Sequence, residues 1–451
     1  MRTLLLVVGV ALVALLSFTS AAPVAVSAMP AVTAPPPLPP LSIVPPPPSG
    51  SYPDFVFVGN INGSTMEIDL GLAQTGTWNV PNTNGVGIYD PEQWVVVFYF
   101  NNITVPTGKT VRFKNHPSRA AVALLAYNSM LIQGSIDVSG GGGGLHANGV
   151  TAEPGPGGYR GSRSGIAAGT SHAAFGPGGA FSLPPGGASY GRHGTHATVG
   201  GVYSTPPNPL PGVVYGNALI TQLIGGSGGG GYHTGGGGQA GGGAGGGAIL
   251  LAANQAIAFA NGSIRSFGGS SGSHFGVGSG GSIRIVADSV DIPDGSGVWA
   301  YAYYSASAGI GRIRIERNNF GGIPGGVNPP ASIVTGNAHN SVLFQTVNRQ
   351  ELRIISVAGQ TAPLDPRAGV LGTESADIFA PAPGAGDVVI EGRNVPMSAP
   401  IFLRATAVSG TTQGEISVTG SPVGNDTYWT RTVSVDFGGG YTCLQARAVL
   451  P

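Results

Sequence analysis

One pattern of short alternating strands occurs three times in this chain, and it constrains the fold more than any other feature of the sequence. The copies cover residues 121–138, 248–264 and 281–300, and a shorter fourth copy covers residues 311–316. Apolar residues alternate with polar or small ones in each copy, which predicts β-strands with one buried face. A unit this small cannot cover its own apolar face. The pattern therefore predicts copies that stack in parallel, as in a solenoid.

Further strands are expected upstream of the first copy, where β-branched and aromatic runs are bounded by Gly, Pro and Asn. These runs are Phe55–Val58, Trp94–Phe100, Ile103–Val105 and Thr110–Phe113. No amphipathic helix pattern is evident after residue 28, so the chain is predicted to be all-β.

The run Ile103–Phe113, followed by Leu131–Val138, resembles the coils of right-handed parallel β-helix proteins of the pectate-lyase-like type. It is most similar to glycine-rich secreted bacterial proteins of unassigned function that are built on such coils. The resemblance covers roughly residues 94–140 and 245–320. It implies a right-handed parallel β-helix (solenoid), and it supports the fold far better than any activity.

Residues 140–247 are predicted to be a long glycine-rich insertion, with 39 glycines in 108 residues. The scarcity of large apolar side chains favours loose loops. Runs such as Gly235–Gly247 instead favour bundled polyglycine II helices, because backbones without side chains can approach closely. Both alternatives remain open. The composition resembles the glycine-rich tips of some phage adhesins and the glycine-rich domains of some mycobacterial surface proteins.

The C-terminal residues 387–451 contain five alternating strands with regular turn signals, which predicts a small β-sandwich. Leu352–Ile355 is a candidate sixth strand. This part resembles the immunoglobulin-like accessory domains of secreted bacterial proteins. It lacks the Cys-Trp-Cys signature, since Cys443 is the only cysteine of the chain.

The first 28 residues are typical of a secretory signal peptide. Leu4–Leu16 is an apolar stretch too short for an ordinary membrane span, and Val26, Ser27 and Ala28 offer a small-residue cleavage site. Cleavage after Ala22 is less favourable because Pro23 follows it. We therefore expect a secreted or cell-surface protein of bacterial type, with no membrane span after signal removal.

These features divide the chain into seven regions. They are a signal peptide (1–28), a proline-rich spacer (29–54), an N-terminal β region with the first coils (55–139), the glycine-rich insertion (140–247), the remaining coils (248–345), a strand and linker (346–386) and the β-sandwich (387–451).

Charge is scarce and balanced. Only 9% of residues are charged, against about 25% in ordinary soluble domains, and Lys plus Arg equal Asp plus Glu at 20 each. A nucleic-acid partner is excluded on this basis, because such proteins use clustered basic residues to displace phosphate counterions.

Acidic residues for catalysis or metal binding are few. Six acids occur between Trp94 and Phe320, and the only cluster is Asp288, Asp291 and Asp294. Oxygen ligands at this spacing make it a weak Ca²⁺ candidate, and a solvated turn between coils is the alternative. No other cofactor is expected. No catalytic residue is assigned, because the motifs of polygalacturonase-like enzymes are missing.

Two further groups stand out within the glycine-rich stretch. His193 and His196 have a spacing that suits a transition metal, but no third ligand is evident nearby, so solvated or stacked histidines are the alternative. Five tyrosines offer rings for surface contact with sugars, or alternatively anchors that hold the stretch to the body. They are Tyr159, Tyr190, Tyr203, Tyr215 and Tyr232.

The sequence favours a non-catalytic structural or adhesive protein of the cell surface or extracellular matrix, which presents a neutral glycine-rich contact surface. Its expected partner is a glycan or a cell-surface polymer, and self-association is left open. The alternative is a polysaccharide lyase or glycoside hydrolase of the parallel β-helix type. Such a hydrolase would need two carboxyl groups across the scissile bond.

Overall fold

The structure is a computed structural model of the 451-residue chain. It describes residues 42–47, 51–80, 85–143, 151–162, 171–172, 174–179, 193–200, 212–233, 239–270, 276–302, 308–319, 325–336, 338–345, 348–363, 377–379, 384–407, 413–437 and 442–450. The predicted signal peptide lies outside these residues. Within them the fold is all-β, as expected, and helical structure is limited to two 3-10 turns, η1 (Leu70–Leu72) and η2 (Ala338–Asn340).

Sheet B has ten strands and is built from successive copies of the repeated pattern. Its order is β19-β17-β15-β13-β7-β4-β3-β2, with β5 and β8 paired beside this path. The bounds are Gln74–Thr75 (β2), Ile88–Asp90 (β3), Val95–Phe100 (β4), Ile103–Val105 (β5), Ala121–Ala126 (β7), Met130–Ile132 (β8), Ala248–Phe259 (β13), Ser282–Asp291 (β15), Arg312–Arg317 (β17) and Ser332–Thr335 (β19). All neighbouring pairs from β4 to β19 are parallel.

Parallel pairing in sheet B sets equivalent residues of successive copies side by side. Leu124 of β7 pairs with Leu251 of β13, which pairs with Ile285 of β15 and then with Ile315 of β17. All four side chains are buried in one core. The copies therefore stack in register, as the alternating pattern predicts.

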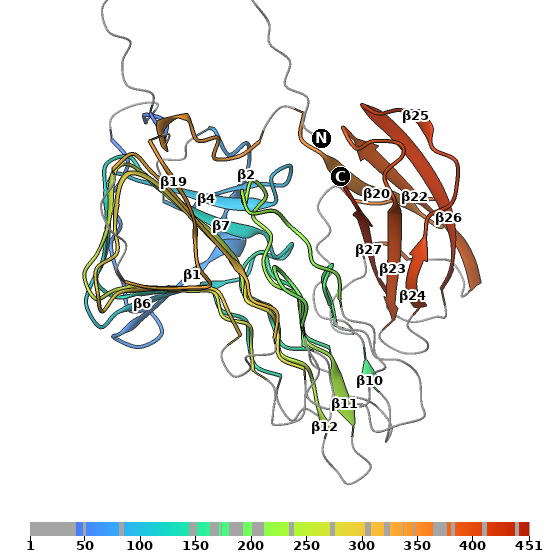
Figure 1. The fold of residues 1–451 in the computed structure, drawn as a ribbon, viewed down its shortest axis with the longest axis horizontal. Coiled ribbons are helices and arrows are strands. Elements are labelled where there is room, and N and C mark those ends of the chain that lie inside the picture. The colour runs from blue at the N-terminus through green and yellow to red at the C-terminus, as the bar shows by residue number, and fades with distance from the viewer. Residues whose placement is uncertain are drawn as a thin grey trace, which may run out of the picture. The chain divides into compact units, whose positions relative to one another are not determined.

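Sheet A has six strands in the order β1-β6-β9-β14-β16-β18, and all its neighbours are parallel. The bounds are Thr65–Asp69 (β1), Thr110–Lys114 (β6), Ser135–Asp137 (β9), Ser263–Arg265 (β14), Gly297–Trp299 (β16) and Gly326–Asn328 (β18). Its inward residues Ile136, Ile264 and Val298 belong to the core that sheet B also lines. The chain visits sheets B and A in turn, so successive coils superimpose in Figure 1.

The outer face of sheet B is covered as well. A second core joins Val97 and Leu250 on that face to Val44 and Phe344 from segments outside the sheet. Strands buried on both faces appear as continuous apolar runs in the sequence, as Val95–Phe100 does.

The expected strand at Phe55–Val58 is wrong, because residues 51–59 pair with no strand. Instead, the N–H of Phe55 donates to the carbonyl of Asn102 (2.9 Å).

Just beyond, the side-chain amide of Asn60 caps the free edge of β1. Its Oδ1 accepts from the N–H of Glu67 (2.7 Å) and its Nδ2 donates to the Glu67 carbonyl (2.9 Å), which occupies an edge that could pair with another chain.

Several described segments of the glycine-rich stretch form a bundle whose backbones are hydrogen-bonded to one another. We define this glycine bundle as residues 138–143, 155–162, 225–230, 241–247, 266–269 and 276–281. The last two segments come from later coils, beyond the predicted insertion at 140–247. They lie between a strand of sheet A and the next strand of sheet B, so several coils contribute to the bundle.

Hydrogen bonds from residues 242–247 show how the glycine bundle is held together. The N–H groups of Gly242 and Gly245 donate to the carbonyls of Ser162 and Tyr159, respectively. The N–H groups of Gly243 and Gly246 donate to the carbonyls of Gly276 and Ser279. The N–H groups of Ala244 and Gly247 donate to the carbonyls of Gly141 and Val138. Every third N–H group therefore donates to the same neighbouring segment. Three residues per turn is the period of a polyproline II-type helix and hence of polyglycine II. Backbone polar groups are satisfied in this way without a regular sheet.

Close approach of backbones makes glycine obligatory in this bundle. A Cβ at Gly243 would lie 1.9 Å from the carbonyl oxygen of Gly269, and one at Gly245 would lie 1.8 Å from that of Gly226. Both contacts are with backbone atoms, which cannot rotate away as a side chain can. The strands would have to separate to admit a methyl group.

The described residues from 351 to 450 form two antiparallel sheets that share one core. One sheet contains β20 (Glu351–Val357), β21 (Gln360–Thr361), β22 (Gly384–Arg393), β25 (Val423–Asn425) and β26 (Tyr428–Phe437), and the other contains β23 (Ile401–Ala407), β24 (Gln413–Ser417) and β27 (Thr442–Ala448). β20 matches the candidate sixth strand. A separate small sheet contains β10 (Ser171–His172), β11 (Gly231–His233) and β12 (Gln239–Ala240).

Replacing Gly243 with Ala should lower the free energy of unfolding by about 2 kcal/mol or more, because overpacking forces the backbone apart. Urea unfolding followed by circular dichroism measures the change. Gly63→Ala is the matched control, since an added Cβ there meets no atom within 4 Å. It should shift stability by less than about 0.5 kcal/mol. Equal effects of the two substitutions would contradict the packing argument.

Candidate functional site

The three aspartates of the predicted calcium site do not converge. Asp288 lies on β15, where its Oδ1 accepts a hydrogen bond from Asn318 Nδ2 (2.8 Å). Asp291 ends the same strand and Asp294 lies in the next turn, both exposed. Among the residues that the structure describes, no three or more His, Cys, Asp or Glu side chains are grouped as a metal site would require. Asp291 and Asp294 thus have the positions expected of a solvated turn.

The two predicted histidine ligands bond to the glycine bundle instead. The N–H of Val277 donates to His193 Nδ1 (3.0 Å), and His196 Nδ1 donates to the carbonyl of Gly280 (2.8 Å). Both side chains are buried. Their three-residue spacing, which suggested a chelate, matches the three-residue spacing of their partners on the neighbouring backbone. Burial lowers the pKa of each imidazole to about 4.

The predicted tyrosines fall into two groups. Tyr190 and Tyr203 lie outside the described residues, as does the side chain of Tyr232. Tyr215 is an anchor: its hydroxyl donates to the carbonyl of Gly225 (2.6 Å), and its ring stacks on His196 with centroids 4.7 Å apart. Burial raises its pKa well above the ordinary value. Tyr159 is partly buried, with its ring centroid 6.2 Å from that of Trp94.

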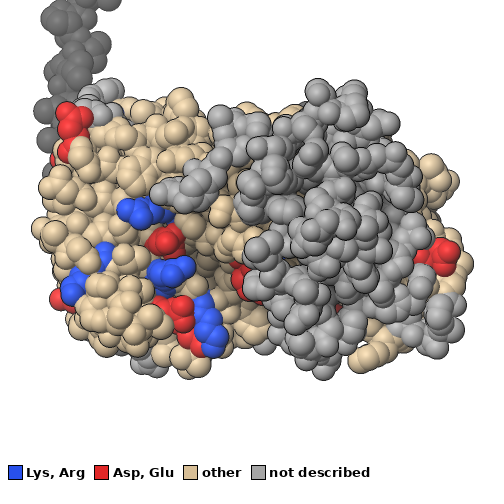
Figure 2. All heavy atoms as spheres, turned by 90° about the horizontal axis from the view of Figure 1, so that it is seen from below, with Lys and Arg blue, Asp and Glu red and all other residues tan. Residues whose placement is uncertain are grey.

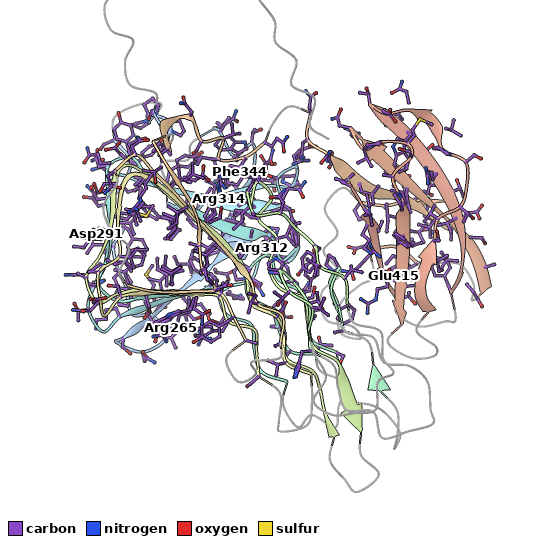
Figure 3. All side chains as sticks on the ribbon, in the orientation of Figure 1. Arg265, Asp291, Arg312, Arg314, Phe344 and Glu415 are labelled. Atoms are coloured by element: carbon purple, nitrogen blue, oxygen red, sulfur yellow. The ribbon has the colours of Figure 1, made fainter. Side chains whose placement is uncertain are left out.

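A group of buried charges on the outer face of sheet B fastens a loop. Glu316 Oε1 accepts hydrogen bonds from Arg284 Nε (2.8 Å) and Arg314 Nε (2.7 Å). Arg284 also donates to the carbonyls of Val342 and Leu343 (both 3.0 Å). Burial alone would raise the pKa of Glu316, but the charge of Arg284 and the hydrogen bonds from its neighbours lower it. Figure 3 shows Arg314 and Phe344 on this side of the body.

The outward side chains of sheet A form a continuous row across the coils, which we call the outer row. Strand pairing aligns Glu67, Arg112, Asp137, Arg265, Trp299 and Asn328. The first four alternate in charge, and Arg112 Nε lies 3.9 Å from Asp137 Oδ2. The pair Lys114–Asp69 (2.8 Å) joins the same two strands as Glu67 and Arg112. In Figure 2, which views the molecule from below, acidic and basic side chains lie next to one another.

Three partly exposed aromatic rings, one of which belongs to the outer row, lie close together. Phe267 and Trp299 are stacked with centroids 6.2 Å apart, and Phe267 and Tyr301 are tilted at 4.8 Å. The indole of Trp299 folds back over Gly297, because an added Cβ there would lie 2.1, 2.4 and 2.7 Å from three adjacent ring atoms. These nearly equal distances place Gly297 beneath the face of the ring. The opposite face of the indole therefore points away from the strand.

Arg265 lies between Asp137 and Trp299 in the outer row. Its Cζ is 5.6 Å from the centroid of the Trp299 ring, within reach of a cation–π interaction. Among the described residues its guanidinium makes no hydrogen bond or ion pair, and its Nε is buried without a partner. A guanidinium has five N–H donors, so this face combines unused donors with aromatic surface. Figure 3 shows Arg265 on the side of sheet A.

Sequence reasoning missed this face, although the repeats contain its signal. Aligning Ser135–Gly141, Ser263–Gly269 and Gly297–Ala302 on their buried residues places Asp137, Arg265 and Trp299 at one position. Ser139, Phe267 and Tyr301 then share the position two residues later. The residues at these outward positions differ in type from copy to copy, so the sequence pattern did not indicate a common site. Only the register of the strands shows that they are neighbours.

Comparisons of the chain with protein-family models, with curated proteins and with solved structures found no match. Among the residues that the structure describes, no helix has the length and apolar character that crossing a membrane requires.

The buried histidines predict a loss of stability in mild acid. Their folded pKa of about 4 lies below the ordinary 6.5, so the unfolded chain binds protons that the folded chain does not. Stability should fall as the pH drops from 6.5 toward 4, by up to about 3 kcal/mol for each histidine. Urea unfolding at several pH values measures this.

His193→Asn provides the comparison for that pH series, because its side-chain oxygen can accept the hydrogen bond from Val277 and does not titrate. The variant should show a shallower decline of stability between pH 6.5 and 4. A decline identical to that of the unmodified protein would show that His193 does not contribute.

Proposed function

We propose that this chain is an exported, non-catalytic structural or adhesive protein of the cell surface or extracellular matrix. We infer that its body is a right-handed parallel β-helix followed by an immunoglobulin-like β-sandwich. The parallel, in-register ladders of sheets A and B support the first part. Two antiparallel sheets that share one core support the second.

The glycine bundle is the observation that carries the proposal. It contains no Asp, Glu, His, Lys or Cys, and its backbone groups bond to one another. Ordering glycine loses more conformational entropy than ordering any other residue. A long element in which glycine is nevertheless sterically required, as at Gly243 and Gly245, favours a mechanical use as a rigid spacer or contact surface.

The acidic residues of the body support the same conclusion. Four of the six acids between Trp94 and Phe320 are engaged in holding segments together: Asp137, Glu153, Asp288 and Glu316. Glu153, for example, accepts from Arg160 Nε (3.0 Å) and pairs with Arg119 (3.3 Å). Carboxylates committed in this way are poorly placed to act as the acid and base of glycoside cleavage.

Export can be tested by producing the full chain in a bacterial host that secretes proteins. We expect a mature protein outside the cytoplasmic membrane that begins at Met29, as determined by mass spectrometry. Ala28→Phe should block processing, because the residue before the cut must be small. Ala22→Phe is the control and should be processed normally. Blocked processing in the control alone would contradict the predicted cleavage site.

The adhesive role is tested with the secreted protein on bacterial cells, on insoluble glycans and on surfaces coated with the protein itself. We expect retention on at least one of them, without release of sugar products in the presence or absence of Ca²⁺. Product release that is lost in Asp291→Ala would overturn the proposal in favour of a polysaccharide-cleaving enzyme. Retention on none of these surfaces would also count against it.

A further inference from the structure

We propose that the outer row and its three aromatic rings bind an extended, uncharged glycan whose chain crosses the strands of sheet A. This inference rests on the adhesive role proposed above, and it specifies the face and the class of ligand. The residues that carry it are Asp137, Arg265, Trp299, Phe267 and Tyr301.

The aromatic rings supply the apolar part of the contact. A pyranose sugar has a face of C–H bonds that packs against the face of an aromatic ring. Trp299 is partly exposed, with Gly297 against one face of its indole and the Cζ of Arg265 5.6 Å from the ring centroid. Phe267 is stacked with the indole, with ring centroids 6.2 Å apart and planes 17° apart, and adds a second ring to the cluster. Tyr301 adds a third ring with a hydroxyl group.

The spacing of the outer row matches a repeating ligand. Neighbouring strands lie about 4.8 Å apart, which is close to the length of one sugar in an extended glycan chain. Successive sugars can therefore meet successive positions of the row, from Asp137 through Arg265 and Trp299 to Asn328. A coiled glycan would lose this correspondence after one or two sugars.

The charges of the outer row favour a neutral ligand. Glu67 and Asp137 balance Arg112 and Arg265, so the row has no net charge to attract a polyanion. Hydroxyl groups both donate and accept hydrogen bonds. They can accept from the Arg265 guanidinium, which makes no hydrogen bond or ion pair among the described residues, and donate to the Asp137 carboxylate.

The test uses the secreted protein in sedimentation assays with insoluble cellulose and chitin as extended neutral glycans. Soluble polygalacturonate is the polyanionic probe and glycogen the coiled one, both followed by affinity electrophoresis. We expect binding to cellulose or chitin that changes little with salt. Trp299→Ala should weaken this binding about tenfold or more, whereas Trp299→Phe should retain most of it.

Tyr428→Ala is the matched control, because Tyr428 is 47% exposed on β26, far from the outer row in sequence. It should leave binding unchanged. Thermal unfolding of each variant shows whether it is folded, and Arg265→Gln gives a second variant that leaves the aromatic rings intact. Arg265→Gln should weaken binding at least threefold or so.

Four outcomes would overturn the inference. If the unmodified protein binds cellulose or chitin and folded Trp299→Ala and Arg265→Gln bind equally well, the face is wrong while the adhesive role stands. Binding only to polygalacturonate, with strong salt dependence, would show that the ligand is anionic. If no glycan is bound but cells or the protein itself are, the ligand class is wrong. Retention on no surface at all would overturn the proposed function too.

Discussion

Backbone hydrogen bonds between glycine-rich segments of several coils form the glycine bundle, and much of the structure depends on them. Residues 242–247 donate to three different neighbours in rotation, and those neighbours come from several coils. The bundle therefore links coils that also meet through sheets A and B. Since a Cβ at Gly243 would come within 1.9 Å of a neighbouring carbonyl, the linkage exists only while these positions remain glycine. The buried histidines His193 and His196 depend on the same backbone for their hydrogen bonds.

Parallel pairing in register has a different consequence. Residues at equivalent positions of successive copies lie side by side and form rows across the coils. On the inner side the rows are uniform, as with Leu124, Leu251 and Ile285, and they form the core. On the outer side of sheet A the rows are mixed, and they bring an acid, an arginine and a tryptophan together. The outer side of sheet B takes a third form, in which Arg284 and Arg314 share Glu316 and hold a loop over the sheet. Removing Glu316 would leave two buried cations without their carboxylate, which is the destabilising case for buried ion pairs.

Several features of the fold could be predicted, and the misses have identifiable causes. Period-two alternation marked β7, β13, β15 and β17 because their inner faces are buried. The same alternation at Phe55–Val58 was misleading, since an extended segment can pack its side chains without joining a ladder. The spacing of His193 and His196 suggested a metal. The spacing instead matches that of Val277 and Gly280, the backbone partners of the two histidines on the neighbouring segment. The outer row was missed because its members have no common residue type.

The amino-acid sequence by itself determined that the described part of the chain is all-β, that its repeated units stack, and that residues 140–247 have too few side chains for an ordinary core. These follow from local pattern and composition, which act wherever the residues lie. Only the tertiary structure decided that the glycines pack as a bundle shared by several coils, and that Arg265 lies beside Trp299. The physical reason is that both depend on register between segments far apart in sequence. A one-residue change of register would turn these outward residues into the core.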